Sequence, residues 1–454
     1  MKNKMIGLNT NFEHKKNSDK QVVYIKVYCV IVLIVSLITP SFPIASGIPA
    51  IHISDVLLLL SPFYIGLVVG RIVLDVRVIV LMTITVLIIW SILWGAILGF
   101  NASFGDLFFV IRMAKYIGSV VLASALVMVM KSCRQALRWF LQRFVIIGLG
   151  LGLIVIQQYF DIFSLNATYV KFVAPTQYET LVGGYPWPRP VGMIGNPNEL
   201  GFLLGLLALT SVWLFFVKQT GSYRWAILGF IYFVLMGLTM SRSAGFSILG
   251  GLFILLIMFG VQGLTLRKQR IVIPRTFFRV FLLIVLLGIS FQIIISKTNA
   301  IEEILWRFSG EYVEQAYETR SENWSENLEL IKKSPFWGVG TLKHSGDFQY
   351  AADNEWLLLY RIGGGVLPLL VASIFVLGSV MVRKQSSREA RVLVVTVAVA
   401  SFVYMIPAAL FFSLTIMPMV LFILVLAAPL PTLRIKILTG SKTFLFLNTI
   451  FIPR

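Results

Sequence analysis

The stretch VIVLMTITVLIIWSILWGAIL at residues 78–98 contains no charged side chain. A bilayer core about 30 Å thick is crossed by about 20 apolar residues of α-helix. Lipid offers the backbone no hydrogen-bond partners, so a segment that crosses it must satisfy its own N–H and C=O groups as a helix. Residues 78–98 therefore predict a transmembrane helix.

Apolar stretches of similar length recur through the whole chain. Of its 454 residues, 58% are hydrophobic and 13% are charged, whereas soluble domains are about half apolar and about a quarter charged. This composition excludes an ordinary soluble domain and predicts an all-α polytopic membrane protein with about 12 transmembrane helices. The predicted spans are residues 22–39, 53–70, 78–98, 107–130, 139–160, 199–217, 225–240, 243–260, 280–295, 354–380, 392–410 and 414–432.

The net charge of +19 is distributed unevenly over this topology. With the N-terminus in the cytoplasm, the inner segments hold 27 of the 39 Lys and Arg residues but only 4 of the 20 acidic residues. This bias agrees with the positive-inside rule. It predicts a multi-pass protein of the plasma membrane with both termini cytoplasmic, and it removes the exposed basic face that nucleic-acid binding would need.

Two outer segments are much longer than the short turns between the other spans, and long ordered loops are usually functional. In the larger one, apolar and aromatic residues recur at three- and four-residue steps, which predicts a helical cap on the mouth of the bundle. The predicted order is a cytoplasmic N-terminal segment (1–21), spans 1–5 (22–160), an outer loop (161–198), spans 6–9 (199–295), a large outer helical loop (296–353), spans 10–12 (354–432) and a basic cytoplasmic tail (433–454).

The first long outer segment ends in GGYPWPRPVGMIGNPNELG at residues 183–201. Asn196 and Asn198 supply amide groups at a predicted helix start. Unpaired N–H groups at a helix N-terminus, next to an arginine such as Arg189, suit an anion. The alternative for Arg189 is an ion pair with an acid inside a structured loop, and the sequence favours neither.

Ser241-Arg242-Ser243 interrupts an apolar stretch at the outer end of the predicted span 8. An ionised side chain at this depth either faces a water-filled cavity or snorkels to the interface. Substrate binding by Ser241 and Arg242 is the functional hypothesis, and snorkelling is the alternative. Arg112 and Lys115 lie one helix turn apart in span 4 and are further candidates, although for Lys115 we expect anchoring at the interface.

The second long outer segment contributes candidates on its predicted helix and at its end. Arg320 and Trp324 are four residues apart and share a helix face. Asp353 and Asn354 open the predicted span 10, where either residue would cap the helix. Asp353 would equally suit a base that takes a proton from a substrate hydroxyl. The alternatives for that base are Glu355 and His344.

The sequence contains no motif typical of a metal site or of a nucleotide-binding loop. The chain contains no Asp-x-Asp pair, and GVGTLK at residues 338–343 lacks the spacing of a phosphate-binding P-loop. We therefore expect neither a metal nor another cofactor.

Taken in chain order, the outer motifs resemble the O-antigen ligase and polymerase superfamily, membrane glycosyltransferases that use undecaprenyl-diphosphate-linked sugars. The motifs are GNPNELG at 195–201, TMSRSAG at 239–245, RSENW at 320–324, SPFWGVG at 334–340 and DNEWLLLYRIGG at 353–364. The ordered set is more specific than any one of its members.

The resemblance implies a GT-C-like fold and an inverting, metal-independent glycosyl transfer on the outer face of the membrane. By position, Arg189 and Arg320 look like the catalytic arginines that bind the diphosphate, and Arg242 looks like the arginine of the family's serine-arginine motif. The implied partners are the polyprenyl-diphosphate-linked donor, the acceptor glycan and membrane lipid, without nucleic acid.

One position departs from the family pattern. Ligases of this family usually carry a histidine-asparagine pair where this chain has Asp353-Asn354. The departure favours a polymerase of the Wzy type, which would extend O-antigen, capsule, exopolysaccharide or a teichuronic-type polymer. The alternative is a ligase that passes a finished glycan to lipid A core or protein. A transporter is the lesser alternative, because the mid-span positions are almost free of charge.

Several properties stay open at the level of sequence. They are the sugars and their linkage, the Gram type of the host, the oligomeric state, and whether a chain-length regulator or a flippase assists the protein.

Overall fold

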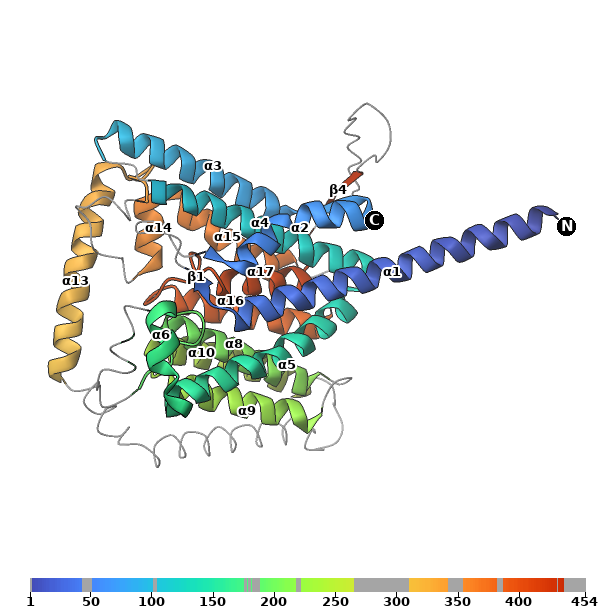
Figure 1. Cartoon of the computed structure of the whole chain (residues 1–454). Coiled ribbons are helices and arrows are strands. Elements are labelled where there is room, and N and C mark those ends of the chain that lie inside the picture. Colours follow the sequence, from blue (N-terminus) through green and yellow to red (C-terminus); the bar gives the residue numbers. More distant parts are fainter. Residues whose placement is uncertain are drawn as a thin grey trace.

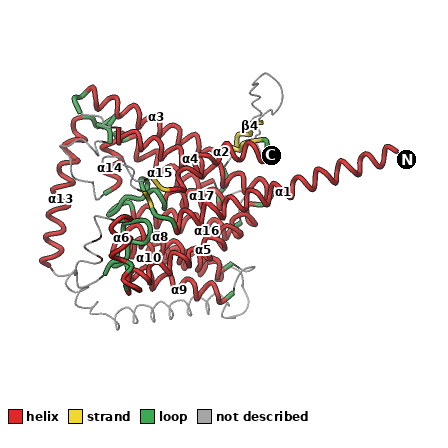
Figure 2. The backbone as a smooth tube through the Cα atoms, in the orientation of Figure 1, coloured by secondary structure: helices red, strands yellow, loops and turns green. Residues whose placement is uncertain are grey.

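The structure is a computed structural model and describes residues 2–42, 51–100, 104–174, 178, 181, 188–217, 222–264, 310–341, 354–381, 387–430 and 432–436. This part of the chain is mostly helical (Figures 1 and 2). Six helices in it are long and apolar enough to cross a membrane. They are Asp19–Ile38, Val76–Ile97, Phe109–Met130, Cys133–Phe160, Pro197–Phe216 and Arg242–Phe259.

These helices support an all-α, multi-pass membrane protein. Four shorter apolar helices accompany them, at Ile53–Val69, Tyr223–Leu238, Val366–Val380 and Ile416–Ala427. The predicted span at residues 280–295 lies outside the described residues. The number of about 12 spans therefore stays a prediction.

The N-terminal helix α1 (Lys2–Ile38) projects beyond the other helices toward the N-terminus (Figure 1). It runs without a break through the predicted boundary between the N-terminal segment and the first span. A short antiparallel pair of β1 (Ser41–Phe42) and β2 (Ile51–His52) leads into α2 (Ile53–Val69).

Strand β3 (Arg71–Asp75) precedes α3 (Val76–Ile97) and pairs antiparallel with β4 (Thr432–Lys436), which follows the last helix. Two connectors that the charge pattern assigns to the same side of the membrane thus lie side by side. A second contact of this kind joins two other basic connectors, because Glu389 accepts hydrogen bonds from Arg134 at 2.9 Å and Arg138 at 3.3 Å.

Helices α4 (Phe104–Met130) and α5 (Cys133–Phe160) follow, and then the short η1 (Ile162–Ser164) and α6 (Asn166–Val173). The centre of the bundle is formed by α8 (Pro197–Phe216) and α17 (Ile416–Ala427), which are buried almost along their whole lengths. A helix that is apolar on all sides is expected in such a central position.

Helices α9 (Tyr223–Leu238) and α10 (Arg242–Leu264) are separated only by residues 239–241. The break contains Met240 in a left-handed backbone conformation, with φ of 50°. The sequence places a division at this point, and the structure shows that the chain turns between two helices there.

Helix α13 (Gly310–Lys333) lies across one end of the bundle (Figure 1), within the segment predicted to be a helical loop. We call this the cap end, and α13 the cap helix. The opposite end, where β4 lies and beyond which α1 projects in Figure 1, is called the termini end.

The predicted span 354–380 is not one helix but two, α14 (Glu355–Gly363) and α15 (Val366–Met381). Gly364 breaks it with φ of 63°, and a Cβ atom there would collide with the backbone carbonyl of Phe336. The next predicted span also ends early, because α16 (Arg388–Tyr404) stops before an irregular stretch of residues 405–415. We call this stretch the α16–α17 segment.

Candidate functional site

The α16–α17 segment is held inside the bundle by the carboxylate of Glu355, the first residue of α14. This fully buried side chain accepts backbone hydrogen bonds from Leu410 at 2.6 Å, Phe411 at 2.8 Å and Phe412 at 3.0 Å. Irregular backbone among apolar helices needs such partners, because an unpaired buried N–H group is costly. Glu355 thus binds three backbone N–H groups, and its candidacy as a catalytic base stays a prediction.

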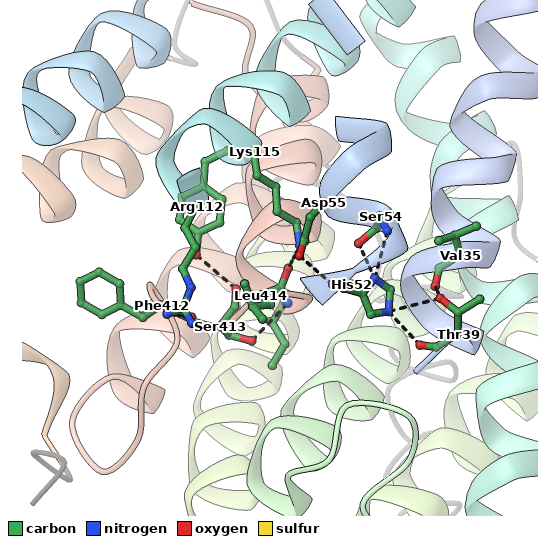
Figure 3. A network of polar contacts seen from close by, with 12 residues as sticks. Val35, Thr39, His52, Ser54, Asp55, Arg112, Lys115, Phe412, Ser413 and Leu414 are labelled. Atoms are coloured by element: carbon green, nitrogen blue, oxygen red, sulfur yellow. Dashed lines mark hydrogen bonds and ion pairs between the residues drawn. The ribbon is translucent and has the colours of Figure 1, made fainter. Parts of the chain in front are cut away.

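Basic side chains of α4 bind the carbonyl groups of the same segment (Figure 3). Arg112 donates a hydrogen bond to the carbonyl oxygen of Phe412 at 3.3 Å. Lys115 donates to the carbonyl oxygen of Leu414 and forms an ion pair with Asp55 of α2. The predicted anchoring of Lys115 at the membrane interface is wrong, because this side chain is buried inside the bundle.

His52 fixes the start of α2, to which Asp55 belongs. Its Nδ1 accepts a hydrogen bond from the backbone of Ser54 at 3.2 Å, while Nε2 lies 2.8 Å from the carbonyl oxygen of Thr39. Only the neutral imidazole that carries its proton on Nε2 satisfies both contacts. Burial lowers the pKa of His52, which favours the same neutral form.

Arg189 lies at the N-terminal end of α8. Its Nε donates to the carbonyl oxygen of Thr239 at 3.1 Å, and a terminal nitrogen donates to Oδ1 of Asn198 at 3.3 Å. These two acceptors orient the guanidinium. Arg189 is partly exposed.

The other predicted residues of this region surround Arg189. Asn196 caps α8, since its side chain accepts from the backbone N–H groups of Asn198 at 2.8 Å and of Glu199 at 3.4 Å. Ser241 accepts from the backbone of Ala244 at 3.2 Å at the start of α10. The two helix starts are close together, because a Cβ atom on Gly201 would come within 2.7 Å of Thr239 Oγ1 and 3.0 Å of Ser241 Cβ.

The structure therefore brings Arg189, Asn196, Asn198 and Ser241 together where α8 meets the turn between α9 and α10. Arg242 follows Ser241 as the first residue of α10. We call these five residues the arginine cluster. Their roles as ligands of a substrate stay a prediction.

Glu199 connects the arginine cluster to the α16–α17 segment, and the sequence reasoning missed it. Its carboxylate accepts a hydrogen bond from the hydroxyl of Ser413. A signal for Glu199 is present in GNPNELG, since an acid in the first helical turn interacts favourably with the helix dipole. Ser413 lies in an apolar stretch that carries no comparable signal.

The cap helix is attached to the bundle through Arg361 of α14. This arginine donates to Oδ1 of Asn327 on α13 at 2.9 Å and to the carbonyl oxygen of Thr341 at 3.2 Å. The hydroxyl of Thr341 in turn donates to Asp106 of α4. These contacts fix the C-terminal half of α13 over α14 and α4.

The two remaining described candidates of the large loop lie on α13 itself. Arg320 is partly exposed there, one turn before Trp324. In the part of the chain that the structure describes, the buried indole N–H of Trp324 has no acceptor. A buried donor of this kind is costly unless a further group satisfies it.

The head of α14 is capped by Asn354, which accepts from the backbone of Trp356 at 3.0 Å and of Leu357 at 3.2 Å. The capping that the sequence offered to either residue of the Asp353-Asn354 pair is therefore performed by Asn354. Asp353 and His344, the two other base candidates, lie outside the described residues. Both stay predictions.

Comparison with known families gives one match. Residues 225–365 match the model of a family described as O-antigen ligase. A comparison with proteins of curated function finds no match. The matched range runs from α9 to the end of α14 and includes Arg242, Arg320, Trp324 and Asn354, while Arg112 and Arg189 precede it.

Proposed function

We propose that this membrane protein polymerises undecaprenyl-diphosphate-linked oligosaccharide repeat units into a surface polysaccharide. The match of residues 225–365 to the O-antigen ligase family supports this proposal. The family supports an enzyme of glycan transfer in general. The donor, the product and the choice of a polymerase over a ligase belong to the proposal.

The observation that carries the proposal is the arginine cluster at the N-terminal ends of two helices. When a glycosidic bond forms, negative charge develops on the departing lipid diphosphate. Arginine binds such an anion with two parallel hydrogen bonds, and positively polarised helix N-termini add to the attraction. Arg189 and Arg242 would bind the diphosphate in this way without help from a metal.

The α16–α17 segment would form the floor of this site. It meets the cluster through the contact between Glu199 and Ser413, and Arg112 lies on its other side. Preorganised charges lower a transition state because they need no reorganisation during the reaction. Arg320 and Trp324 on the cap helix would then contact the sugar or the diphosphate from above.

Asp353 is the proposed base that takes the proton of the acceptor hydroxyl. It immediately precedes Asn354, which is already used as the helix cap. A general base must come within hydrogen-bond reach of the proton that it removes. The absence of the family's histidine at this position favours the polymerase.

We place the reaction on the outer face of the plasma membrane. The positive-inside rule supports this placement. The contact between β3 and β4 gives further support, because it joins two basic connectors, and β4 lies at the end of the bundle away from the cap helix (Figure 1).

The test replaces the arginines singly and measures the glycan product. Arg189→Ala, Arg242→Ala and Arg320→Ala should each abolish polymer, leaving single repeat units on the lipid, while membrane abundance is unchanged. Arg388→Ala, an exposed arginine at the start of α16, is the control and should give normal polymer.

Size analysis of lipid-linked glycans in a deletion strain separates the two activities. Loss of a polymerase leaves single repeat units, whereas loss of a ligase leaves long chains on the lipid. Long chains would therefore decide for the ligase. Normal polymer length in all three arginine variants would contradict the proposal that these arginines bind the diphosphate.

A further inference from the structure

The turn after the cap helix exposes two large aromatic side chains next to each other. We call residues 334–338 the aromatic turn. Phe336 is 75% exposed and Trp337 is 46% exposed. Lys332 and Lys333, at the end of α13, are exposed beside them. Neighbouring exposed apolar side chains of this size indicate a surface that something apolar covers.

The aromatic turn is held firmly against the end of α3. Trp94 of α3 donates its indole N–H to the hydroxyl of Ser334 at 3.0 Å. The ring of Trp337 meets that of Trp90 edge-on, with ring centres 6.0 Å apart. The position of the turn relative to α3 is therefore fixed by packing.

Helix α3 presents one apolar face to the outside of the bundle, and this face ends at the aromatic turn. Its exposed residues follow one another at three- and four-residue steps, as residues on a single helix face do. They include Ile79, Met82, Val86, Trp90, Leu93 and Ile97, and Ile89 is exposed beside Trp90. Because α3 is long and apolar enough to cross a membrane, we expect this face to meet lipid.

We propose that the aromatic turn inserts into the bilayer leaflet at the cap end of the bundle. Phe336 and Trp337 lie at the boundary between acyl chains and headgroups, and Lys332 and Lys333 lie at the level of the lipid phosphates. Aromatic side chains collect at this boundary in membrane proteins, and lysines near it bind anionic headgroups.

Three features identify lipid as the occupant. The turn continues the lipid-facing side of α3, so the same medium covers both. Its aromatic residues are of the kind that forms interfacial belts. The adjoining pair of lysines matches phosphate groups, whereas lysine is depleted in protein interfaces. The C-terminal end of the cap helix is thereby anchored to the membrane surface.

The experiment measures the depth of spin labels in the full-length protein, reconstituted in vesicles of phosphatidylethanolamine and phosphatidylglycerol. Cys29 and Cys133 are first replaced by serine, so that each protein carries a single label. Labels are then introduced by Phe336→Cys, by Val86→Cys in the lipid-facing part of α3, and by Glu326→Cys on the exposed side of α13. Collision with oxygen reports lipid, and collision with a water-soluble nickel chelate reports water.

We expect the Phe336 label to favour oxygen, at a shallower depth than the Val86 label, and the Glu326 label to favour nickel. The depth of a label introduced by Lys332→Cys should lie between the depths of the Phe336 and Glu326 labels. If Phe336→Cys does not fold, the Lys332 label tests the position of the turn in its place. A Phe336 label that favours nickel as Glu326 does would place the turn in water and overturn the proposal. Protection from both reagents would overturn it too, because a protein surface would then cover the turn.

Discussion

The carboxylate of Glu355 shows how one residue determines the shape of a distant segment. Its two oxygens bind three successive N–H groups of residues 410–412, 55 to 57 positions further along the chain. Without this acceptor, those N–H groups would be buried without a hydrogen-bond partner, and the irregular conformation of the α16–α17 segment would be destabilised. Glu355, one of the candidates for the catalytic base, therefore has a structural role.

Replacing this carboxylate should destabilise the protein without touching the arginine cluster. In Glu355→Gln, one oxygen becomes an amide donor that faces other donors, so at least one buried N–H group loses its partner. We expect a loss of about 1–3 kcal/mol in the free energy of unfolding, measured as a lower melting temperature in detergent. The exposed Glu329→Gln on α13 is the control and should melt like the unchanged protein. Equal melting of both variants would contradict this role.

The ion pair of Lys115 and Asp55 should behave as a coupled unit. Lys115→Met leaves the carboxylate of Asp55 without its buried cation, and Asp55→Asn leaves the ammonium group of Lys115 without its carboxylate partner. Breaking one side of a buried pair costs about 3–5 kcal/mol. The double variant should lose clearly less than the sum of the two single losses when melting temperatures are compared. Additive losses would show that the pair does not interact.

Among the elements, the long apolar helices and the break at residues 239–241 were predictable, whereas the break at Gly364 and the early end of α16 were not. Residues 78–98 are recognised as a span from their apolar length alone, and α3 covers nearly the same residues. Residues 405–415 are apolar as well, so no local pattern separates them from a span. Glu355, Arg112 and Lys115 bind the backbone of this irregular stretch. Contacts between residues so far apart in the sequence cannot be recognised from local hydropathy.

The same limit applies to the candidate site. The motifs around Arg189 and Ser241 were found separately, each through a polar residue in unusual surroundings. Their closeness comes from the packing of α8 against the turn between α9 and α10, at Gly201. The link from Glu199 to Ser413 could not be predicted, because a serine in an apolar stretch is unremarkable on its own.

The break between α14 and α15 gives a prediction at the scale of elements. Gly364→Ala puts a Cβ atom against the carbonyl of Phe336 and forces a left-handed conformation on alanine. It should destabilise the protein by more than about 1 kcal/mol. Gly250→Ala in α10 is the control, since a Cβ atom there has nothing within 4 Å. This helical position should gain up to about 1 kcal/mol. Thermal unfolding measures both changes, and a tolerated Gly364→Ala would refute the argument.

The two ends of the helix bundle differ in their charge and in the elements that contact one another there. The basic connectors that contain β3 and β4 meet at the termini end, whereas α13 lies across the opposite end (Figure 1). The positive-inside rule then predicts which end faces the cytoplasm.

Cysteine labelling of intact cells measures this sidedness. In a chain whose Cys29 and Cys133 are replaced by serine, a membrane-impermeant maleimide should label Glu326→Cys on α13 directly. It should label Arg388→Cys at the start of α16 only after the membrane is permeabilised. Direct labelling of both positions, or the reverse pattern, would contradict the proposed orientation.

The pairing of β3 with β4 also has a consequence for the order of assembly. Strand β3 leaves the ribosome early, but its partner residues 432–436 are made only after all the intervening helices. Two further contacts can form only when the end of α17 has been made. Arg77 donates to the carbonyl oxygen of Ala428 at 2.9 Å, and Asp75 accepts from the backbone N–H of Leu430 at 3.1 Å. Strand β3 is thus synthesised early but is paired only after α17 has been made, so this contact is among the last to form during insertion.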